Sequence, residues 1–265
     1  MAPEAYPIVL TIAGSDSGGG AGIQADLKTF HALGVYGTSA ITAITAQNTL
    51  GVHAVHPVPL AHVRAQIDAV VNDLRPAAFK TGMLATIGLV ETVAAAIREH
   101  GLRHYVLDPV MVATSGHRLL SEDAVAALIQ DLLPLADVVT PNLHEARILS
   151  GVPIADEEDM RLAGDRILEL GVSAVLIKGG HLAGEAVDLL MDGGVEHVWR
   201  RASIDTVHTH GTGCTLSAAI AAGIARGDEL PDAVDRAVRY VGRAIAAAPG
   251  LGSGHGPVNH FVDPD

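Results

Sequence analysis

The chain alternates short apolar runs, each about as long as a buried strand, with longer segments of amphipathic helical character. Successive parallel strands need a helix between them, so this alternation predicts an α/β fold whose mostly parallel sheet is covered on both faces. The expected strands are Ile8–Ala13, Thr38–Thr45, Val106–Asp108, Val138–Thr140 and Ala174–Lys178. The expected helices are Ile23–Leu33, Leu60–Asp73, Ile87–His100, Asp123–Leu133, Glu158–Leu170, Thr212–Arg226 and Pro231–Ala247. Two further apolar runs, Val187–Met191 and Val195–Trp199, flank Asp192-Gly193-Gly194 and predict a hairpin late in the sheet.

Length and composition favour one cytoplasmic domain that spans residues 1–265. Hydrophobic residues make up 49% of the 265 positions, but no uncharged apolar run approaches the ~18–20 residues of a membrane span. Met1–Ala5 has no basic region before an apolar one, so we expect no signal peptide. Cys214 is the single cysteine, which excludes an internal disulfide and agrees with a reducing compartment.

The charge balance argues against nucleic acid as a partner. The formal net charge is −13, which repels a phosphate backbone at long range. Only three lysines are present, Lys28, Lys80 and Lys178. An anionic ligand would therefore need helix N-termini, backbone amides or a metal ion to hold it.

The unusual residues follow the expected strands. Ligands of open parallel sheets bind beyond the carboxyl ends of the strands, so these positions predict one site at that edge. The segments concerned are Gly14–Gly22, Gln47, Asp108, Asn142 with Glu145, Lys178-Gly179-Gly180 and Gly211–Cys214.

The glycine-rich segment Gly14–Gly22 lies between the first expected strand and the first expected helix. Glycines there let the backbone approach a ligand closely, and they equally suit a plain connection that needs positive φ angles. Gly20–Ala25 fits the dinucleotide pattern G-x-G-x-x-A, which also requires an acidic residue about 20 positions further on. No Asp or Glu occurs between Lys28 and Asp68, which disfavours a Rossmann oxidoreductase. The P-loop pattern G-x-x-x-x-G-K-S/T is absent.

A second glycine turn, His210–Thr215, leads into an apolar helix. Its glycines free several N–H groups to point at one anion, and the helix dipole adds about half a positive charge there. The same position is expected to lower the pKa of the Cys214 thiol. The alternative is that Cys214 is a small buried residue that packs the start of the helix.

Asn142 and Glu145 stand three residues apart at an expected helix start, so their side chains share a face. An amide oxygen and a carboxylate suit Mg²⁺, but the same pair is equally a capping box.

The chain has 14 histidines but no H-E-x-x-H pattern, and one cysteine cannot build a thiolate cluster, so a zinc site is rejected. No G-x-S-x-G elbow supports a serine hydrolase.

Taken together, motifs spread along the chain closely resemble those of the hydroxymethylpyrimidine/phosphomethylpyrimidine kinases of thiamine biosynthesis, a ribokinase-like family. They occur in the expected order: Thr11–Asp16, Gly19–Phe30, Ile41–Asn48, Thr81–Leu84, Asp108–Met111, Thr140–Asn142 with Glu145, Lys178–His181, His210–Ala218 and Gly254–Phe261. The resemblance implies a ribokinase-like three-layer α/β/α sandwich and an enzyme that phosphorylates 4-amino-5-hydroxymethyl-2-methylpyrimidine and then its monophosphate, with ATP and Mg²⁺.

The resemblance also implies a role for each matching residue. Cys214 looks like the family's base, and Gly211, Thr212 and Gly213 look like its anion hole. The residues that resemble substrate contacts are Gln47, Asp26, Gly14, Met83 and Val110. Lys178 and Asn142 fall on the ATP side, and Glu145 and Asp108 lie where the superfamily organises the metal ion.

Some positions depart from the family pattern, and alternatives stay open. Ser17-Gly18 stands where Pro-Ser is common, and Thr114 stands where lysine is often expected, with Arg118 as a possible substitute cation. The alternatives are a pyridoxal or pyridoxine kinase of the same superfamily and a non-catalytic pyrimidine-binding protein. Leu50–Pro59 is expected to form a strand flap, a feature that pairs subunits in related kinases, so we expect a homodimer.

Overall fold

The computed structural model describes residues 6–112, 120–180 and 185–264. Thr114, Arg118 and His181 of the sequence interpretation lie outside these residues. Eight strands form one sheet in the order β10-β9-β8-β7-β6-β5-β1-β2. They are β1 Ile8–Ala13, β2 Tyr36–Ile41, β5 Ala78–Thr81, β6 Tyr105–Leu107, β7 Val138–Val139, β8 Ala174–Lys178, β9 Glu185–Asp192 and β10 Val195–Ala202. Strand β9 is antiparallel to both of its neighbours, and the strands from β8 to β2 are parallel, as the alternation predicts.

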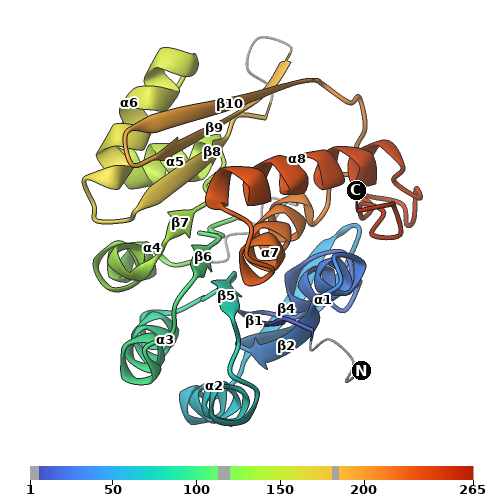
Figure 1. The fold of residues 1–265 in the computed structure, drawn as a ribbon. Coiled ribbons are helices and arrows are strands. Elements are labelled where there is room, and N and C mark those ends of the chain that lie inside the picture. Colours follow the sequence, from blue (N-terminus) through green and yellow to red (C-terminus); the bar gives the residue numbers. More distant parts are fainter. Residues whose placement is uncertain (1–5, 113–119, 181–184, 265) are drawn as a thin grey trace, which may run out of the picture.

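Helices cover both faces of this sheet and give it three layers (Figure 1). One face carries α2 Leu60–Leu74, α3 Ile87–His100, α4 Glu122–Ala127, α5 Leu143–Ser150 and α6 Glu157–Leu168. The other face carries α1 Gly22–Ala32, α7 Thr212–Ala225 and α8 Leu230–Ala246.

Alternate side chains of the central strands supply the two cores. In β1, Leu10 and Ile12 pack in the core beneath α2 and α3, whereas Val9 packs in the core beneath α7 and α8. This division follows from the pleat of a strand, which points successive side chains to opposite faces. Helix α7 is buried along Thr215–Gly223, which explains why its sequence is apolar on all sides.

The expected strand Thr38–Thr45 is wrong as a single element. The chain leaves the main sheet after β2 and enters a separate two-stranded sheet made of β3 Ala43–Asn48 and β4 Gly51–Pro57. Thr42 fixes the bend, because its N–H donates to the Ala13 carbonyl at 2.9 Å and its hydroxyl donates to the Met83 carbonyl at 2.8 Å. The expected flap at Leu50–Pro59 is confirmed for β4, but the partner strand β3 lies before the expected bounds.

Two other departures have local causes. The sequence interpretation missed β5, because this strand is four residues long and contains a lysine. The expected helix Asp123–Leu133 is α-helical only in α4 and continues as a π-helical turn over Leu128–Leu132. Across the described ranges, no helix has the length and apolar character that a membrane crossing requires.

Candidate active site

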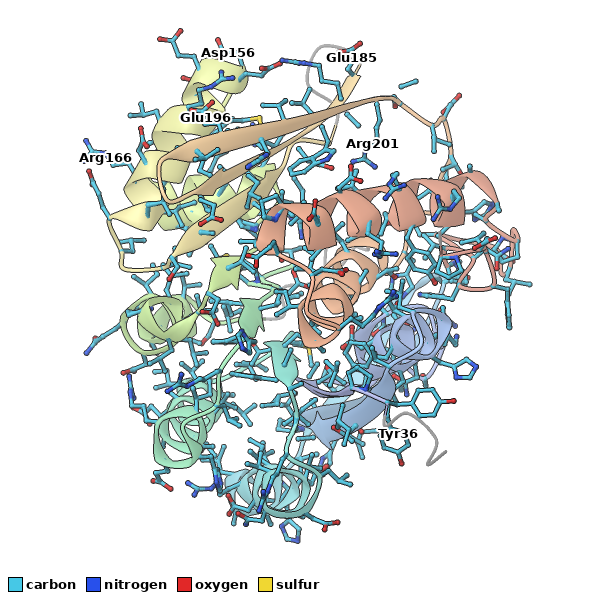
Figure 2. The ribbon with its side chains drawn as sticks, viewed as in Figure 1. Tyr36, Asp156, Arg166, Glu185, Glu196 and Arg201 are labelled. Atoms are coloured by element: carbon cyan, nitrogen blue, oxygen red, sulfur yellow. The ribbon has the colours of Figure 1, made fainter. Side chains whose placement is uncertain are left out.

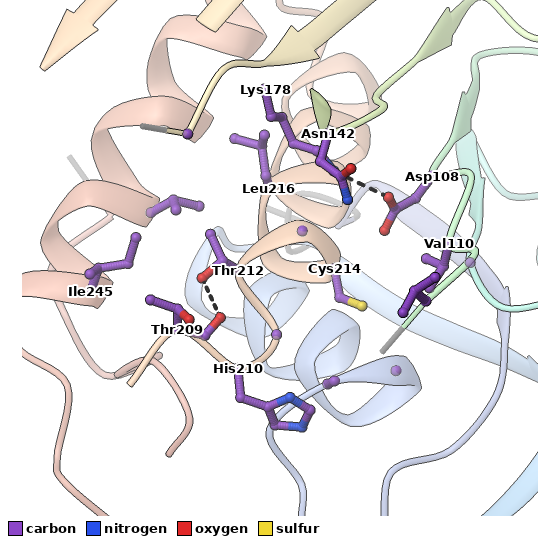
Figure 3. A pocket seen from close by; sticks show the side chains of 18 of the residues that line it. Asp108, Val110, Asn142, Lys178, Thr209, His210, Thr212, Cys214, Leu216 and Ile245 are labelled. Atoms are coloured by element: carbon purple, nitrogen blue, oxygen red, sulfur yellow. Dashed lines mark hydrogen bonds and ion pairs between the residues drawn. The ribbon is translucent and has the colours of Figure 1, made fainter. Parts of the chain in front are cut away.

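A cavity of about 480 Å³ lies at the carboxyl edge of the sheet, bordered by the start of α7 (Figure 3). All but one of the predicted site residues line it, which confirms that the expected segments meet at one edge. They are Gly14, Gln47, Met83, Asp108, Val110, Asn142, Glu145, Lys178, Gly211, Thr212, Gly213 and Cys214. The exception is Asp26.

The glycine turn at the start of α7 is packed against the first glycine turn. Gly211 caps the helix with a φ of 81°, and a Cβ at this position would overlap the carbonyl oxygen of Gly20. Thr212 closes the turn by donating its hydroxyl to the Thr209 carbonyl at 2.7 Å, an interaction drawn in Figure 3. The first N–H groups of a helix have no acceptor within it, so this turn presents amide donors where it borders the cavity.

Cys214 is partly exposed at the cavity, but its charge state differs from the expectation. Burial raises the pKa of the thiol to about 12, and the carboxylates of Asp108 and Asp26 act in the same direction. The Lys80 ammonium and the N–H of Gly22 oppose this rise without cancelling it. The prediction of a lowered thiol pKa is wrong, because desolvation outweighs the opposing effects of Lys80 and the Gly22 N–H.

A chain of alternating charges runs beneath the cavity. The Asp26 carboxylate is fully buried, accepts from the Thr11 hydroxyl at 2.6 Å and pairs with the Lys80 ammonium at 3.1 Å. Lys80 lies 4.0 Å from Asp108, and Asp108 in turn lies 3.5 Å from the ammonium of Lys178. Asp26 is therefore paired with Lys80 and does not itself line the cavity.

Sequence reasoning missed Lys80, although one signal was available. Lys80 is one of only three lysines, and it lies directly before the Thr81-Gly82 motif. Burial opposes its charge, yet Asp26, Cys214 and Asp108 together raise its pKa above the ordinary value. Lys80 is therefore a permanent buried cation beneath the cavity floor.

Asn142 and Glu145 form the capping box that the sequence left open as an alternative. The Asn142 side chain accepts from the Glu145 N–H at 2.9 Å, and the Glu145 carboxylate accepts from the Asn142 N–H at 2.8 Å. Burial raises the pKa of Glu145 to about 7, and nearby Asp108 adds to the rise while Lys178 opposes it. The capping role and a ligand-facing role coexist, because both side chains also line the cavity.

Asp16 organises the first glycine turn and reaches the second one. Its carboxylate accepts from the N–H groups of Gly20 at 3.0 Å and Ala21 at 2.9 Å, and it pairs with His210 at 2.9 Å. Burial works to raise the pKa of Asp16, but His210 and the backbone donors outweigh it and lower the pKa. His210 also lies 3.3 Å from the Gln47 amide nitrogen, so the turn is joined to the predicted ring contact. Sequence reasoning gave Asp16 and His210 no role, although both stand inside its two glycine motifs.

A second part of the cavity wall comes from β9, β10, the segment after β10, and helices α7 and α8. Its residues are Ala186, Asp188, Arg201, Ala202, Ser203, Ile204, Leu216, Val241, Gly242 and Ile245, and of these only Leu216 lies in a motif that the sequence analysis marked. This side of the cavity is mainly aliphatic and carries the Asp188–Arg201 ion pair. Figure 3 shows Ile245 across the cavity from Cys214 and Val110, with Leu216 beside Lys178 between them.

Comparison with known proteins agrees with this arrangement. Residues 16–259 match the model of the family described as phosphomethylpyrimidine kinase. A hydroxymethylpyrimidine/phosphomethylpyrimidine kinase of Rhizobium meliloti is 57% identical over 258 residues, which cover 96% of this chain and 97% of the relative.

Two solved structures are also similar. One is an ADP complex of Bacillus subtilis pyridoxal kinase, with a TM-score of 0.90 and 42% identity over 97% of this chain and 98% of that chain. The other is a phosphomethylpyrimidine kinase of Clostridium difficile, with a TM-score of 0.82 and 44% identity over 91% of this chain and 100% of that chain.

Proposed function

The chain belongs to the phosphomethylpyrimidine kinase family, and on that basis we propose how its residues divide the work of phosphoryl transfer from ATP. The enzyme phosphorylates 4-amino-5-hydroxymethyl-2-methylpyrimidine and its monophosphate, which gives the diphosphate used in thiamine biosynthesis. The observation that carries the assignment is the convergence of the Gly211–Cys214 turn, Gln47 and Glu145 on one cavity within a chain that matches this family.

The pyrimidine lies against the β1 side of the cavity. A neutral planar ring needs a donor and an acceptor at its edge, and the Gln47 amide supplies both. Gly14 leaves room for Met83, whose Cε lies 2.6 Å from the place that a Cβ on Gly14 would occupy. These two residues and Val110 form the apolar wall, and the buried Asp26 supports the floor through Lys80.

The phosphate groups lie between the start of α7 and Lys178. The transferring phosphoryl group carries its charge on equatorial oxygens, and fixed amide donors stabilise this charge with little reorganisation. Gly211 and Gly213 supply those donors, Thr212 holds the turn because its N–H donates to the Thr209 carbonyl at 3.2 Å, and Lys178 neutralises charge on the nucleotide. Burial opposes the Lys178 charge, but Asp108 and Glu145 raise the pKa of this ammonium, so it stays protonated.

The donor set fits Mg²⁺ held mostly by water and phosphate. Among the described residues, no group of three or more His, Cys, Asp or Glu side chains could enclose an ion. Mg²⁺ keeps several waters and uses one or two carboxylates, and Asp108 and Glu145 are available at the cavity. When bound, the ion would neutralise phosphate charge, and Asn142 would orient its water.

Cys214 is the proposed acceptor of the alcohol proton. A thiol with a pKa of about 12 holds its own proton at neutral pH, so this role requires the thiolate and a rate that rises with pH. In single-turnover transfer, Cys214→Ala is expected to lose about 10²–10⁴ in rate and to lose that rise. A variant with the wild-type rate and pH profile would leave Cys214 as a packing residue.

The competing reading is a pyridoxal kinase, since one structural neighbour has that activity. The 57% identical relative has the pyrimidine-kinase name, which favours the thiamine precursor. Specificity constants for the hydroxymethylpyrimidine, its monophosphate and pyridoxal, with products scored by mass, test the assignment. A preference for pyridoxal, or no diphosphate from the monophosphate, would contradict it.

The proposed enzyme is a cytoplasmic homodimer of one domain, and the β3–β4 hairpin is its pairing surface. Ile44 and Leu50 of this hairpin region are 54% and 64% exposed, and a second copy would cover them. Sedimentation of the wild type against Leu50→Glu tests the dimer, because the buried charge would favour monomers. Equal sedimentation of the two as monomers would contradict it.

A further inference from the structure

Arg201 and Asp188 form an ion pair in the cavity wall. Arg201 is next to the last residue of β10, and its partner in the ladder is Ala186 of β9, two residues before Asp188. Its guanidinium pairs with the Asp188 carboxylate, and one of its terminal nitrogens lies 3.9 Å from the place of a Cβ on Gly242. Figure 2 shows Arg201 between β10 and α8. Both members of the pair line the cavity.

The charges around the cavity make this cation unusual. Four carboxylates line it, from Asp16, Asp108, Glu145 and Asp188. Within the described part of the lining, Lys178 and Arg201 are the Lys and Arg side chains, and Lys178 already faces Asp108 at 3.5 Å. A polyanionic nucleotide that binds beside these carboxylates is repelled by them. Each nearby cation offsets this repulsion, so the position of Arg201 affects how tightly the nucleotide binds.

Asp188 holds the guanidinium in place without using all of its donors. The carboxylate of Asp188 is only 4% exposed and contacts one terminal nitrogen of Arg201. The Nε of Arg201 is buried and has no hydrogen-bond partner among the described residues. A guanidinium carries five N–H donors in a rigid fork that matches phosphate oxygens. The Arg201 side chain is 31% exposed, so terminal donors other than the buried Nε remain for a ligand.

The surroundings of the pair indicate which part of a nucleotide it meets. Ala202 and Ile204 follow Arg201, and Val241 and Ile245 flank Gly242 on α8, so aliphatic side chains suited to a flat base lie beside the guanidinium. On the other side, Asp188 pairs in register with Lys178 at the end of β8, beside the proposed phosphate path. Arg201 therefore lies between a base-sized apolar wall and the phosphate groups.

We propose that Arg201, held by Asp188, binds the phosphates of the nucleotide next to its ribose. This inference rests on the proposed function, in which ATP is the phosphoryl donor. It adds a phosphate contact that is remote from the reacting atoms, so its loss weakens nucleotide binding and leaves recognition of the pyrimidine unchanged.

Calorimetric titration with ADP and with adenosine tests the proposal. A hydrogen bond to a charged group is worth enough that Arg201→Met is expected to raise the Kd for ADP by about tenfold or more. The Kd for adenosine, which has no phosphate, is expected to stay unchanged. The matched control is Arg200→Met, because Arg200 is the neighbouring residue and pairs instead with Glu157.

A second variant shows whether a loss of binding comes from misfolding around an unpaired buried charge. Arg201→Met leaves the Asp188 carboxylate buried without its partner, so the double variant Asp188→Asn with Arg201→Met removes both charges and should show the same selective loss. An unchanged Kd for ADP in the folded double variant, or an equal loss for ADP and adenosine, would overturn the inference. If the wild type binds no ADP, the proposed function itself fails and the inference fails with it.

Discussion

The two ends of the cavity differ in whether backbone or side chains form most of the wall. The end near Cys214 is shaped by backbone: two glycine turns are packed on each other and joined by the Asp16–His210 pair, with the side chains of Gln47, Met83 and Val110 beside them. The end near Ile245 consists of side chains from β9, β10, α7 and α8, with one ion pair among aliphatic groups. Phosphoryl transfer needs fixed donors at the reacting atoms, whereas a base and ribose need mainly a shaped apolar surface.

This contrast predicts different responses to mutation. Backbone that is packed against backbone cannot move aside, so substitutions of the packed glycines should be costly and affect the whole fold. Side chains around a ligand can relax, so substitutions at the Ile245 end should change one binding constant and little else.

The largest expected effect is a difference in stability loss between glycine substitutions at the two ends of α7. Gly211 has a φ of 81° and no room for a Cβ, whereas Gly227, just beyond the other end of the helix, has a φ of 93° and open space around it. Gly211→Ala adds a backbone overlap to the strain of a positive φ and should cost more than about 3 kcal/mol. Gly227→Ala carries only the strain, about 1–2 kcal/mol. Denaturant unfolding of both variants measures the difference, and equal losses would show that the two turns can move apart.

The next effect is on the pH dependence of stability and concerns His260, which contacts the first turn of α7. Its ring nitrogen lies 3.0 Å from the Thr215 hydroxyl in the first turns of α7. Burial, with a small contribution from Lys28, lowers the pKa of His260 from 6.5 to about 4. Between those two values the unfolded chain binds a proton that the folded chain excludes, so the stability contributed by His260 falls as the pH drops from 6.5 towards 4.

The matched variants are His260→Gln and His31→Gln, since His31 is exposed on α1. Glutamine can keep the hydrogen bond to Thr215 but does not titrate. The wild type and His31→Gln should lose on the order of 2 kcal/mol more stability than His260→Gln between pH 6.5 and pH 4. Parallel stability curves for all three proteins would show that the pKa of His260 is the same in the folded and unfolded chains.

The smallest expected effects are changes in two Michaelis constants, each caused by a different variant. Met83 and Ile245 both line the cavity, Met83 at the proposed pyrimidine end and Ile245 at the opposite end. Met83→Ala should raise KM for the pyrimidine about tenfold and Ile245→Ala should raise KM for ATP by a similar factor, because each removes apolar contact area from one ligand. Steady-state kinetics with each substrate varied in turn measure both constants. If either variant raised both constants equally, the two ends would be coupled and the division of the cavity would be wrong.

The sequence interpretation succeeded where a function depends on residues that are close in the chain. The two glycine turns and the Asn142–Glu145 pair each lie within one segment, so their spacing was readable, and the parallel sheet brought their strand ends together. The interpretation was incomplete where the role of a residue depends on a partner that is distant in the sequence. Asp26 is in a family motif, yet its side chain faces Lys80, and nothing in the order of residues states that pairing.

The same limit explains the wrong prediction for the Cys214 thiol pKa and the absence of Arg201 from the sequence analysis. A helix start predicts a lowered thiol pKa, but the size of the opposing desolvation depends on what buries the thiol, and Asp26 and Asp108 are distant in sequence. Arg201 is in a strand rich in charge, and only the ladder with β9 and the approach of α8 turn it towards the cavity.

The sequence by itself determined the α/β alternation, the edge of the sheet that carries the site, and the family. These follow from local periodicity and from short motifs, whose physics acts within a few residues. Only the tertiary structure decided the charge chain from Asp26 to Lys178, the protonated state of Cys214 and the side-chain-lined end of the cavity. Burial and Coulomb interactions depend on distances in space, and folding sets these distances between residues that are far apart in the chain.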